Sequence, residues 1–100
     1  MIRHVILWQL KEDFSDSQKE TLKKEIKQRL EALQGQIPGL LEVKVCINPL
    51  PSSNTDIYLD SAVEDADALD RYQNYPAHVD IKKNLIGPNA RTRLCMDFEA

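Results

Sequence analysis

The sequence predicts an α+β fold with the element order β-α-β-β-α-β, in which both helices lie on one face of an antiparallel four-stranded sheet. Two observations predict it. Apolar side chains recur at every second residue in four short segments, which is the period of a β-strand. Two longer segments, one between the first and second of these and one between the third and fourth, have the helical period instead.

The first strand is predicted at residues 2–10, where apolar side chains occupy both faces. One face carries Ile2, His4, Ile6, Trp8 and Leu10. The other face carries Val5 and Leu7. Because strands that are apolar on both faces are usually buried on both, we expect this strand to be covered on its two sides.

A helix is predicted from about Ser15 to about Leu33, and residues 15–17 supply its N-cap candidates. Its core-facing side chains fall in a band about 80° wide at 100° per residue. They are Leu22, Ile26, Leu30 and Leu33. Interleaved lysines and glutamates on the remaining faces predict a solvated surface. Gly35 and the turn at residues 37–39 end the helix.

Three further strands are predicted downstream. One face of the second strand carries four apolar residues, Leu41, Val43, Val45 and Ile47. The loop after it contains Pro49 and Pro51, which cannot take part in regular strand pairing. The third strand is predicted from Asp56 to Ala62 and the fourth from Arg91 to Phe98. One face of the fourth strand carries Leu94, Met96 and Phe98.

The second helical segment is predicted to break at Pro76. Proline has no backbone N–H, and it pushes the residue before it, Tyr75, out of the helical region. A second helical piece is then expected from Pro76 to about Asn84. On an unbroken helix Tyr72 and His78 would lie about 120° apart, so they can share one cavity only if the break re-aims the second piece.

This element order is the ferredoxin-like pattern. Its helices cover one face of the sheet, but Val5 and Leu7 make the other face apolar as well. A chain of 100 residues has no further layer to cover that face. We therefore expect a homodimer in which two sheets face each other, a dimeric α/β barrel, with Val5 and Leu7 at the dimer interface.

Length and charge limit the remaining possibilities. The chain predicts a single domain, residues 1–100, and its net charge of −3 disfavours a nucleic-acid partner. The apolar N-terminal stretch is too short to span a bilayer and lacks the features of a signal peptide. We therefore expect a cytoplasmic protein without a membrane partner.

No metal ion or organic cofactor is expected. The sequence has neither H-x-x-x-H nor C-x-x-C spacing, and its three glycines occur at predicted turns rather than in a phosphate-binding loop. Cys46 and Cys95 are interpreted as reduced thiols. His4, His78 and the two cysteines can meet only through folding.

Four segments carry a resemblance to a known family. They read IRHVILWQLKED, IPGL, DIYLDSAVEDADALDRYQNYPAH and RLCMDFE, and together they span nearly the whole chain. They resemble the stress-responsive dimeric α/β-barrel family, called Dabb, most specifically in the tyrosine followed by a Pro-x-His turn. The resemblance implies a homodimer and a cavity between sheet and helices lined by His4, Tyr72 and His78. Here Tyr75 stands where the family commonly has histidine, which removes one imidazole from the cavity mouth.

The resemblance leaves two functions open, because the family includes a cofactor-independent polyketide cyclase, a stress protein that acts through assembly, and many members without known activity. The first function is that of a stress-responsive dimer with a small-molecule pocket. Further walls of this pocket, besides His4, would be Ile6, Trp8 and Tyr75. The second is that of a cofactor-independent cyclase or lyase for a small apolar carbonyl or polyketide-like compound. In that enzyme His78 is the general base and Tyr72 donates a hydrogen bond to the carbonyl oxygen.

Each of these residues also has a purely structural interpretation. His78 can pack within a short helix, while Tyr72 fills core volume with its hydroxyl satisfied. His4 and Trp8 can be core residues of the first strand. The replacement at Tyr75 favours the first, non-catalytic function.

Overall fold

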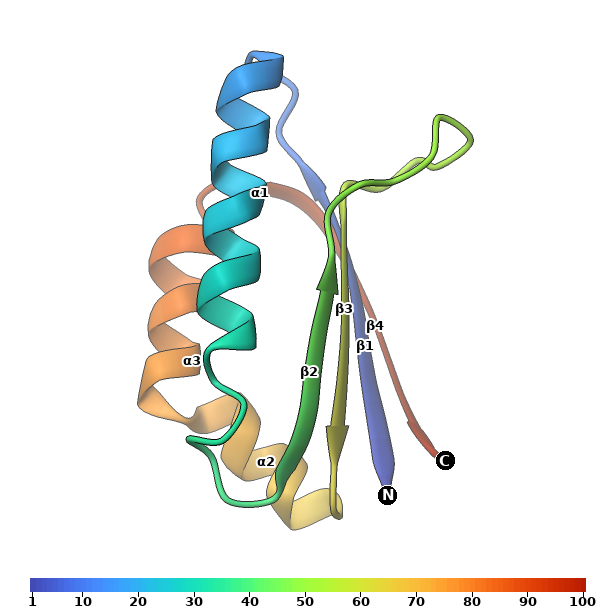
Figure 1. The fold of residues 1–100 in the computed structure, drawn as a ribbon, viewed down its shortest axis with the longest axis vertical. Coiled ribbons are helices and arrows are strands. Elements are labelled where there is room, and N and C mark those ends of the chain that lie inside the picture. Colours follow the sequence, from blue (N-terminus) through green and yellow to red (C-terminus); the bar gives the residue numbers. More distant parts are fainter.

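The structure, a computed structural model that describes residues 1–100, confirms the predicted ferredoxin-like architecture. A four-stranded sheet carries a layer of helices on one face (Figure 1). The elements in chain order are β1 (Ile2–Leu10), α1 (Asp16–Glu31), β2 (Leu40–Cys46), β3 (Ile57–Val63), α2 (Ala66–Asn74), α3 (Pro76–Asp80), the π-helical η1 (Ile81–Ile86) and β4 (Ala90–Glu99). The strand order is β2-β3-β1-β4, and every neighbouring pair is antiparallel. None of the helices combines the length and the apolar character that crossing a membrane requires.

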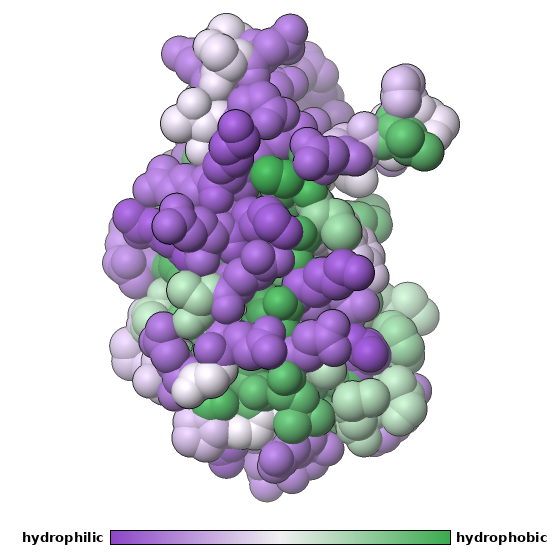
Figure 2. Space-filling model, in the orientation of Figure 1, coloured by the Kyte–Doolittle hydropathy of each residue, from purple (hydrophilic) through white to green (hydrophobic).

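Helix α1 begins at a capping box. The Ser15 hydroxyl accepts a hydrogen bond from the Gln18 N–H at 3.2 Å, and the Gln18 side-chain oxygen accepts one from the Ser15 N–H at 2.8 Å. The helix ends at Glu31, two residues before the predicted end, because the chain then tightens into turns with i→i+3 hydrogen bonds. Leu33 is nevertheless buried beside Ile26 and Leu30, as the predicted core-facing band requires. Mostly hydrophilic residues cover the outward side of α1 (Figure 2).

The prediction for Leu41 in β2 is wrong. The pairing of β2 with β3 shifts between Leu40 and Glu42, so one extra residue is inserted into β2 there. Such a bulge moves the side-chain alternation by one position. Leu40 therefore points into the core, and Leu41 is 46% exposed. The other predicted core residues of this segment are buried, namely Val43, Val45 and Ile47.

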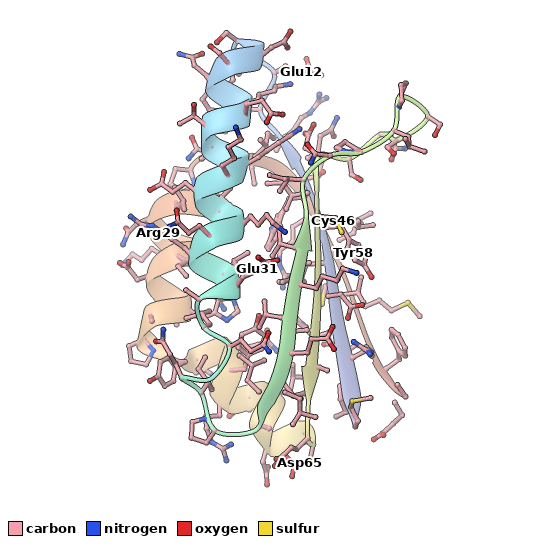
Figure 3. The ribbon with its side chains drawn as sticks, viewed as in Figure 1. Glu12, Arg29, Glu31, Cys46, Tyr58 and Asp65 are labelled. Carbon is pink, nitrogen blue, oxygen red and sulfur yellow. The ribbon has the colours of Figure 1, made fainter.

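Side chains of α1 cover the free edge of β2. The Glu31 carboxylate accepts a hydrogen bond from the Val45 N–H at 3.0 Å, and the Lys27 ammonium donates one to the Val45 carbonyl. Figure 3 shows Glu31 on the side of α1 that faces β2. Because an edge strand has unpaired backbone groups, these contacts protect the edge from pairing with another chain.

The face of the sheet opposite the helices is uncovered, and it is apolar along β1 and β4. In the β1–β4 register Leu7 lies opposite Leu94, and Val5 lies opposite Met96, so these side chains share one face. Leu94 is 62% exposed and Met96 is 66% exposed. We call this surface the open face, defined by Val5, Leu7, Leu94, Met96 and Phe98. Figure 3 shows that Cys46 and Tyr58 project to the same side of the sheet, away from the helices.

Candidate functional site

The helix breaks at Pro76, as predicted. Tyr75 is extended, with φ −63° and ψ 129°, and Pro76 is the first residue of α3. Because proline has no N–H, the Tyr72 carbonyl lacks the partner that an unbroken helix would supply. It instead accepts hydrogen bonds from the Tyr75 N–H at 3.3 Å and from Nδ1 of His78 at 3.0 Å. The His78 imidazole therefore satisfies a backbone group that the break leaves open.

The break brings the predicted aromatic residues together. The rings of Tyr72 and His78 lie with their centroids 4.3 Å apart and their planes 30° from parallel. His4, on β1, meets the Tyr72 ring edge-on, with centroids 5.9 Å apart. All three side chains are buried between the sheet and the helices. We call His4, Tyr72 and His78 the aromatic cluster.

The Tyr72 hydroxyl lies 2.8 Å from the hydroxyl of Ser61, which is fully buried on β3. The sequence alone did not predict Ser61 as a site residue. Burial raises the pKa of Tyr72 to about 12, and the hydrogen bond with Ser61 offsets part of that rise. Tyr72 is therefore protonated near neutral pH, and its hydroxyl is held within the core.

His78 is neutral at physiological pH. Burial lowers its pKa to about 4, the hydrogen bond to Tyr72 opposes this, and the charges of Lys82, His4 and Arg93 lower it further. With Nδ1 donating to the Tyr72 carbonyl, Nε2 carries a lone pair and has no hydrogen-bond partner. Every fully buried side-chain nitrogen and oxygen in the structure has a hydrogen-bond partner. Since Nε2 has none, this atom is not fully buried. This nitrogen is available to accept a hydrogen bond from a ligand.

A cavity of ≈330 Å³ lies between η1 and β4, and none of the three residues of the aromatic cluster lines it. It is lined by Trp8, Lys82, Ile86, Gly87, Ala90, Arg91, Thr92 and Arg93. Two of these residues, Lys82 and Arg93, are the ones whose charges act on His78. Neither forms an ion pair. The cavity therefore presents two positively charged side chains without an acidic partner.

The other predicted pocket residues have different positions. Trp8 lines the cavity, whereas Ile6 is buried in the hydrophobic core. The hydroxyl of Tyr75 lies 3.5 Å from the carbonyl oxygen of Gln36, in the turn after α1. The structure thus gathers His4, Tyr72 and His78 into one cluster, whereas Trp8 lines the separate cavity between η1 and β4.

A π-helical turn forms one side of the cavity. The Gly87 N–H donates to the Lys82 carbonyl at 2.8 Å, an i→i+5 hydrogen bond in place of the usual i→i+4 bond. Lys82, Ile86 and Gly87, which belong to this turn, all line the cavity. Such turns are frequent at functional sites, and no feature of the sequence predicted this one.

Two further side chains meet His4 from the neighbouring strand β4. Nδ1 of His4 contacts the carboxylate of Asp97, and the Cys95 sulfur lies 3.9 Å from the same nitrogen. Folding thus brings His4 and Cys95 together, although they are far apart in the sequence. Asp97 was not identified from the sequence, because only the strand register places it opposite His4.

Replacing Pro76 with alanine is expected to separate the Tyr72 and His78 rings. The new N–H at position 76 can bond to the Tyr72 carbonyl, which extends α2 and removes the acceptor of His78. We expect the fold to survive with a loss of at most about 2 kcal/mol in the free energy of unfolding. Nuclear Overhauser contacts between the two rings should disappear.

The control for this change is Pro88→Ala, which alters a proline in the turn before β4 and leaves the helix break intact. Its ring contacts should match those of the wild type. Retention of the contacts in Pro76→Ala would show that the proline does not position His78.

Comparison with known proteins identifies the family. The stress responsive A/B barrel domain family, Dabb, matches residues 2–100. A dimeric protein of unknown function with a ferredoxin-like fold from Bacteroides fragilis is 26% identical, with a TM-score of 0.92 over 99% of this chain and 95% of that chain. A Dabb-family protein from Mesorhizobium loti is 20% identical, with a TM-score of 0.76 over 99% and 95% of the two chains. A hydroxynitrile lyase from Passiflora edulis is 15% identical, with a TM-score of 0.77 over 97% and 90%.

A search of curated proteins finds no match. The family match covers every element from β1 to β4, and the strand order and helix positions agree with the ferredoxin-like fold of the similar structures. The chain therefore belongs to the stress-responsive α/β-barrel domain family, Dabb.

Proposed function

We propose that this protein is a homodimer that binds a small molecule in the cavity between η1 and β4. The observation that carries this proposal is the ≈330 Å³ cavity, which is lined by Lys82 and Arg93, the two residues whose positive charges act on His78. That volume is within the range typical of small-molecule sites. A shared fold alone would not support a ligand, but a cavity with charged and apolar groups on its wall does.

The lining favours a small, partly apolar compound with a carbonyl or carboxylate oxygen. Trp8 and Ile86 offer apolar walls for its carbon skeleton. Lys82 and Arg93 offer hydrogen-bond donors and positive charge for its oxygen. The sequence-based expectation of a small apolar carbonyl ligand fits these walls.

A second candidate function is cofactor-independent acid/base catalysis at His78. It is favoured by Nε2 of His78, because a neutral imidazole with a free lone pair is the form that accepts a proton. The fold is compatible with such chemistry, since a hydroxynitrile lyase from Passiflora edulis shares it. Two features weaken this candidate. A pKa of about 4 makes His78 a weak base, and the Tyr72 hydroxyl is engaged with Ser61.

Homodimerisation is supported by the open face and by the β2–β3 loop. Proteins of similar structure from Bacteroides fragilis and Thermobifida fusca are described as dimeric. The loop extends past the sheet on the side away from the helices (Figure 1). Leu50 in this loop is largely exposed, and Figure 2 shows a hydrophobic spot at the loop tip. A partner sheet lying on the open face would cover these apolar groups.

A cytoplasmic location is also part of the proposal. Cys46 and Cys95 are both unpaired and exposed. Exposed free thiols are typical of a reducing compartment. Fractionation of cells that express the protein, with an antibody against the chain, tests this point.

Ligand binding is tested by the fluorescence of Trp8, the single tryptophan of the chain, which lines the cavity. A panel of small carbonyl and carboxylate compounds should include one that quenches Trp8, with calorimetry as a second readout. Ala90→Phe places a phenyl ring in the cavity and should weaken that binding at least about tenfold. Thr21→Phe, the matched control, places the same ring in a separate hollow on α1 and should bind normally.

Equal affinity of Ala90→Phe and the wild type would exclude this cavity as the ligand site. Recovery of the ligand after incubation separates the two functions. Unchanged ligand supports binding alone, whereas a product that forms with the wild type and at least about 100-fold more slowly with His78→Gln supports catalysis.

A further inference from the structure

We infer that His4, Cys95 and Asp97 form a binding site for a zinc-type divalent metal ion on the helix-facing side of β1 and β4. None of these residues lines the ≈330 Å³ cavity, so this site is distinct from the ligand cavity. The sequence predicted no metal site, because its cysteines and histidines lack close spacing along the chain.

The strand register brings the three donors to one point. His4 is the direct cross-strand partner of Asp97 in the β1–β4 pair. Cys95 precedes Asp97 by two residues, so both project from the same face of β4. Directly opposed and diagonal side chains on one face of an antiparallel pair lie close together. Donor groups on adjacent strands can therefore converge without any short motif in the sequence.

The distances suit a tetrahedral metal ion. The Cys95 sulfur lies 3.9 Å from Nδ1 of His4 and 3.8 Å from Oδ1 of Asp97. In a tetrahedral zinc site, metal–ligand distances of about 2.0–2.3 Å place the ligand atoms about 3.4–3.6 Å apart. The sulfur is thus within a few tenths of an ångström of its required position. Nδ1 of His4 and the Asp97 carboxylate are in direct contact, and the carboxylate must turn outward by about 1 Å to admit the ion.

The surroundings permit that movement. His4 is buried and held edge-on against the Tyr72 ring, so the nitrogen donor is already oriented. Asp97 and Cys95 are exposed, so their side chains can adjust at little cost. Because two of the three ligands face solvent, a fourth coordination position is open to water, as in catalytic zinc sites.

The chemical types of the three metal-ligating atoms determine which ion the site prefers. A thiolate, an imidazole nitrogen and a carboxylate oxygen together suit Zn²⁺ and similar transition metals, whereas Mg²⁺ and Ca²⁺ prefer oxygen ligands alone. The ion takes the place of the proton between His4 and Asp97: neutral His4 binds the ion through Nδ1 and carries its ring proton on Nε2. The Cys95 thiol loses its proton to the solvent on coordination, so no oxidant or reductant takes part.

Cobalt titration tests the site. Tag-free protein is stripped with a chelator, desalted and titrated with Co²⁺, and bound Co²⁺ is then displaced with Zn²⁺. We expect one Co²⁺ per chain, with a near-ultraviolet thiolate-to-cobalt absorption band and the intense visible bands of tetrahedral cobalt. Zn²⁺ should remove both sets of bands, because it binds such sites more tightly.

Variants assign the ligands. Cys95→Ser should abolish the thiolate band, and Asp97→Asn should weaken Co²⁺ binding about 100-fold or more, since each removes one of three protein ligands. Both residues are exposed, so these changes leave the core intact. Cys46→Ser is the matched control, because Cys46 projects from the other side of the sheet, and it should bind like the wild type (Figure 3).

Three outcomes would overturn the inference. They are a Co²⁺ dissociation constant weaker than about 1 mM, a thiolate band that depends on Cys46, and unchanged binding in Cys95→Ser. In the last case His4 and Asp97 form a hydrogen-bonded pair only. The ligand titrations with Trp8 are performed in chelator, so failure of one proposal does not affect the other.

Discussion

Leu94→Asp is expected to convert the proposed homodimer into a folded monomer. Leu94 lies on β4 opposite Leu7, and it is 62% exposed in the protomer. An aspartate there stays hydrated in the isolated chain, so the protomer keeps its stability. In a dimer that buries the open face, the same carboxylate loses its water without gaining a partner.

The expected effect is large because two-fold symmetry doubles it. Each dimer would bury two uncompensated carboxylates, and a total cost of about 4 kcal/mol or more raises the dissociation constant at least about 1,000-fold. Sedimentation velocity or multi-angle light scattering at micromolar concentration gives the measurement. The wild type should have twice the protomer mass of 11.5 kDa, and Leu94→Asp should have the protomer mass.

Two comparisons make this test specific. Val79→Asp introduces the same charge on α3, in the helical layer, and should remain dimeric. Leu7→Asp changes a half-buried residue of β1 and should reduce both dimerisation and protomer stability. A wild type of protomer mass, or a Leu94→Asp variant that remains dimeric with unchanged affinity, would contradict a dimer built on the open face.

The prediction of the open face illustrates what side-chain period can establish. Alternation in residues 2–10 placed Val5 and Leu7 on one face, and alternation in the last strand placed Leu94, Met96 and Phe98 together. The register confirms that these two sets share one face of the sheet. Side-chain alternation predicts correctly which residues share a face here, because neither strand has a bulge at these residues.

Side-chain alternation gave the wrong prediction for Leu41, and the structure shows why. Strict alternation puts Leu41 on the face of Val43 and Val45, and it puts Leu40 on the face of Glu42 and Lys44. The choice between them depends on the bulge in the β2–β3 pair, which is a property of two strands rather than one. A sequence pattern within β2 therefore could not decide which leucine is buried.

The candidate site was predictable only in part. The family resemblance indicated His4, Tyr72 and His78, and Pro76 explained how two of them approach each other. Ser61 and Asp97 were missed because each joins the site through cross-strand pairing with His4. Polar residues of this kind look like ordinary exposed positions of a strand until the register is known.

The second large effect concerns pH. Between pH 6.5 and pH 4, His78 is expected to destabilise the native protein by about 3 kcal/mol. Burial lowers the pKa of His78 from its ordinary value of 6.5 to about 4. In this pH range the unfolded chain binds a proton at His78 and the native protein does not. The free energy of unfolding is therefore unaffected by this group above pH 6.5, and it decreases as the pH falls toward 4.

The charged and titratable groups around His78 come from four elements. They are Tyr72 on α2, Lys82 on η1, His4 on β1 and Arg93 on β4. Lys82 and Arg93 add positive charge, which further disfavours an imidazolium beside them. Because other ionisable groups of the chain also bind protons as the pH falls, the contribution of His78 must be isolated by difference.

His78→Asn provides that difference. The asparagine amide can occupy the place of Nδ1 and donate to the Tyr72 carbonyl, but it does not titrate. The free energy of unfolding is measured by denaturant titration from pH 7 to pH 4. Chelator and a constant chain concentration make the contributions of metal binding and dimerisation the same for the wild type and the variant. The wild type should lose about 3 kcal/mol more than His78→Asn over this range.

Parallel pH profiles for the wild type and His78→Asn would mean that His78 binds its proton equally well in the native and unfolded states. That result is incompatible with an imidazole that is 2% exposed and faces Lys82 and Arg93. A steeper loss in the wild type would instead show that His78 is held neutral by its surroundings. Since a neutral imidazole leaves Nε2 free to accept, the same measurement tests the form of His78 that the proposed catalysis requires.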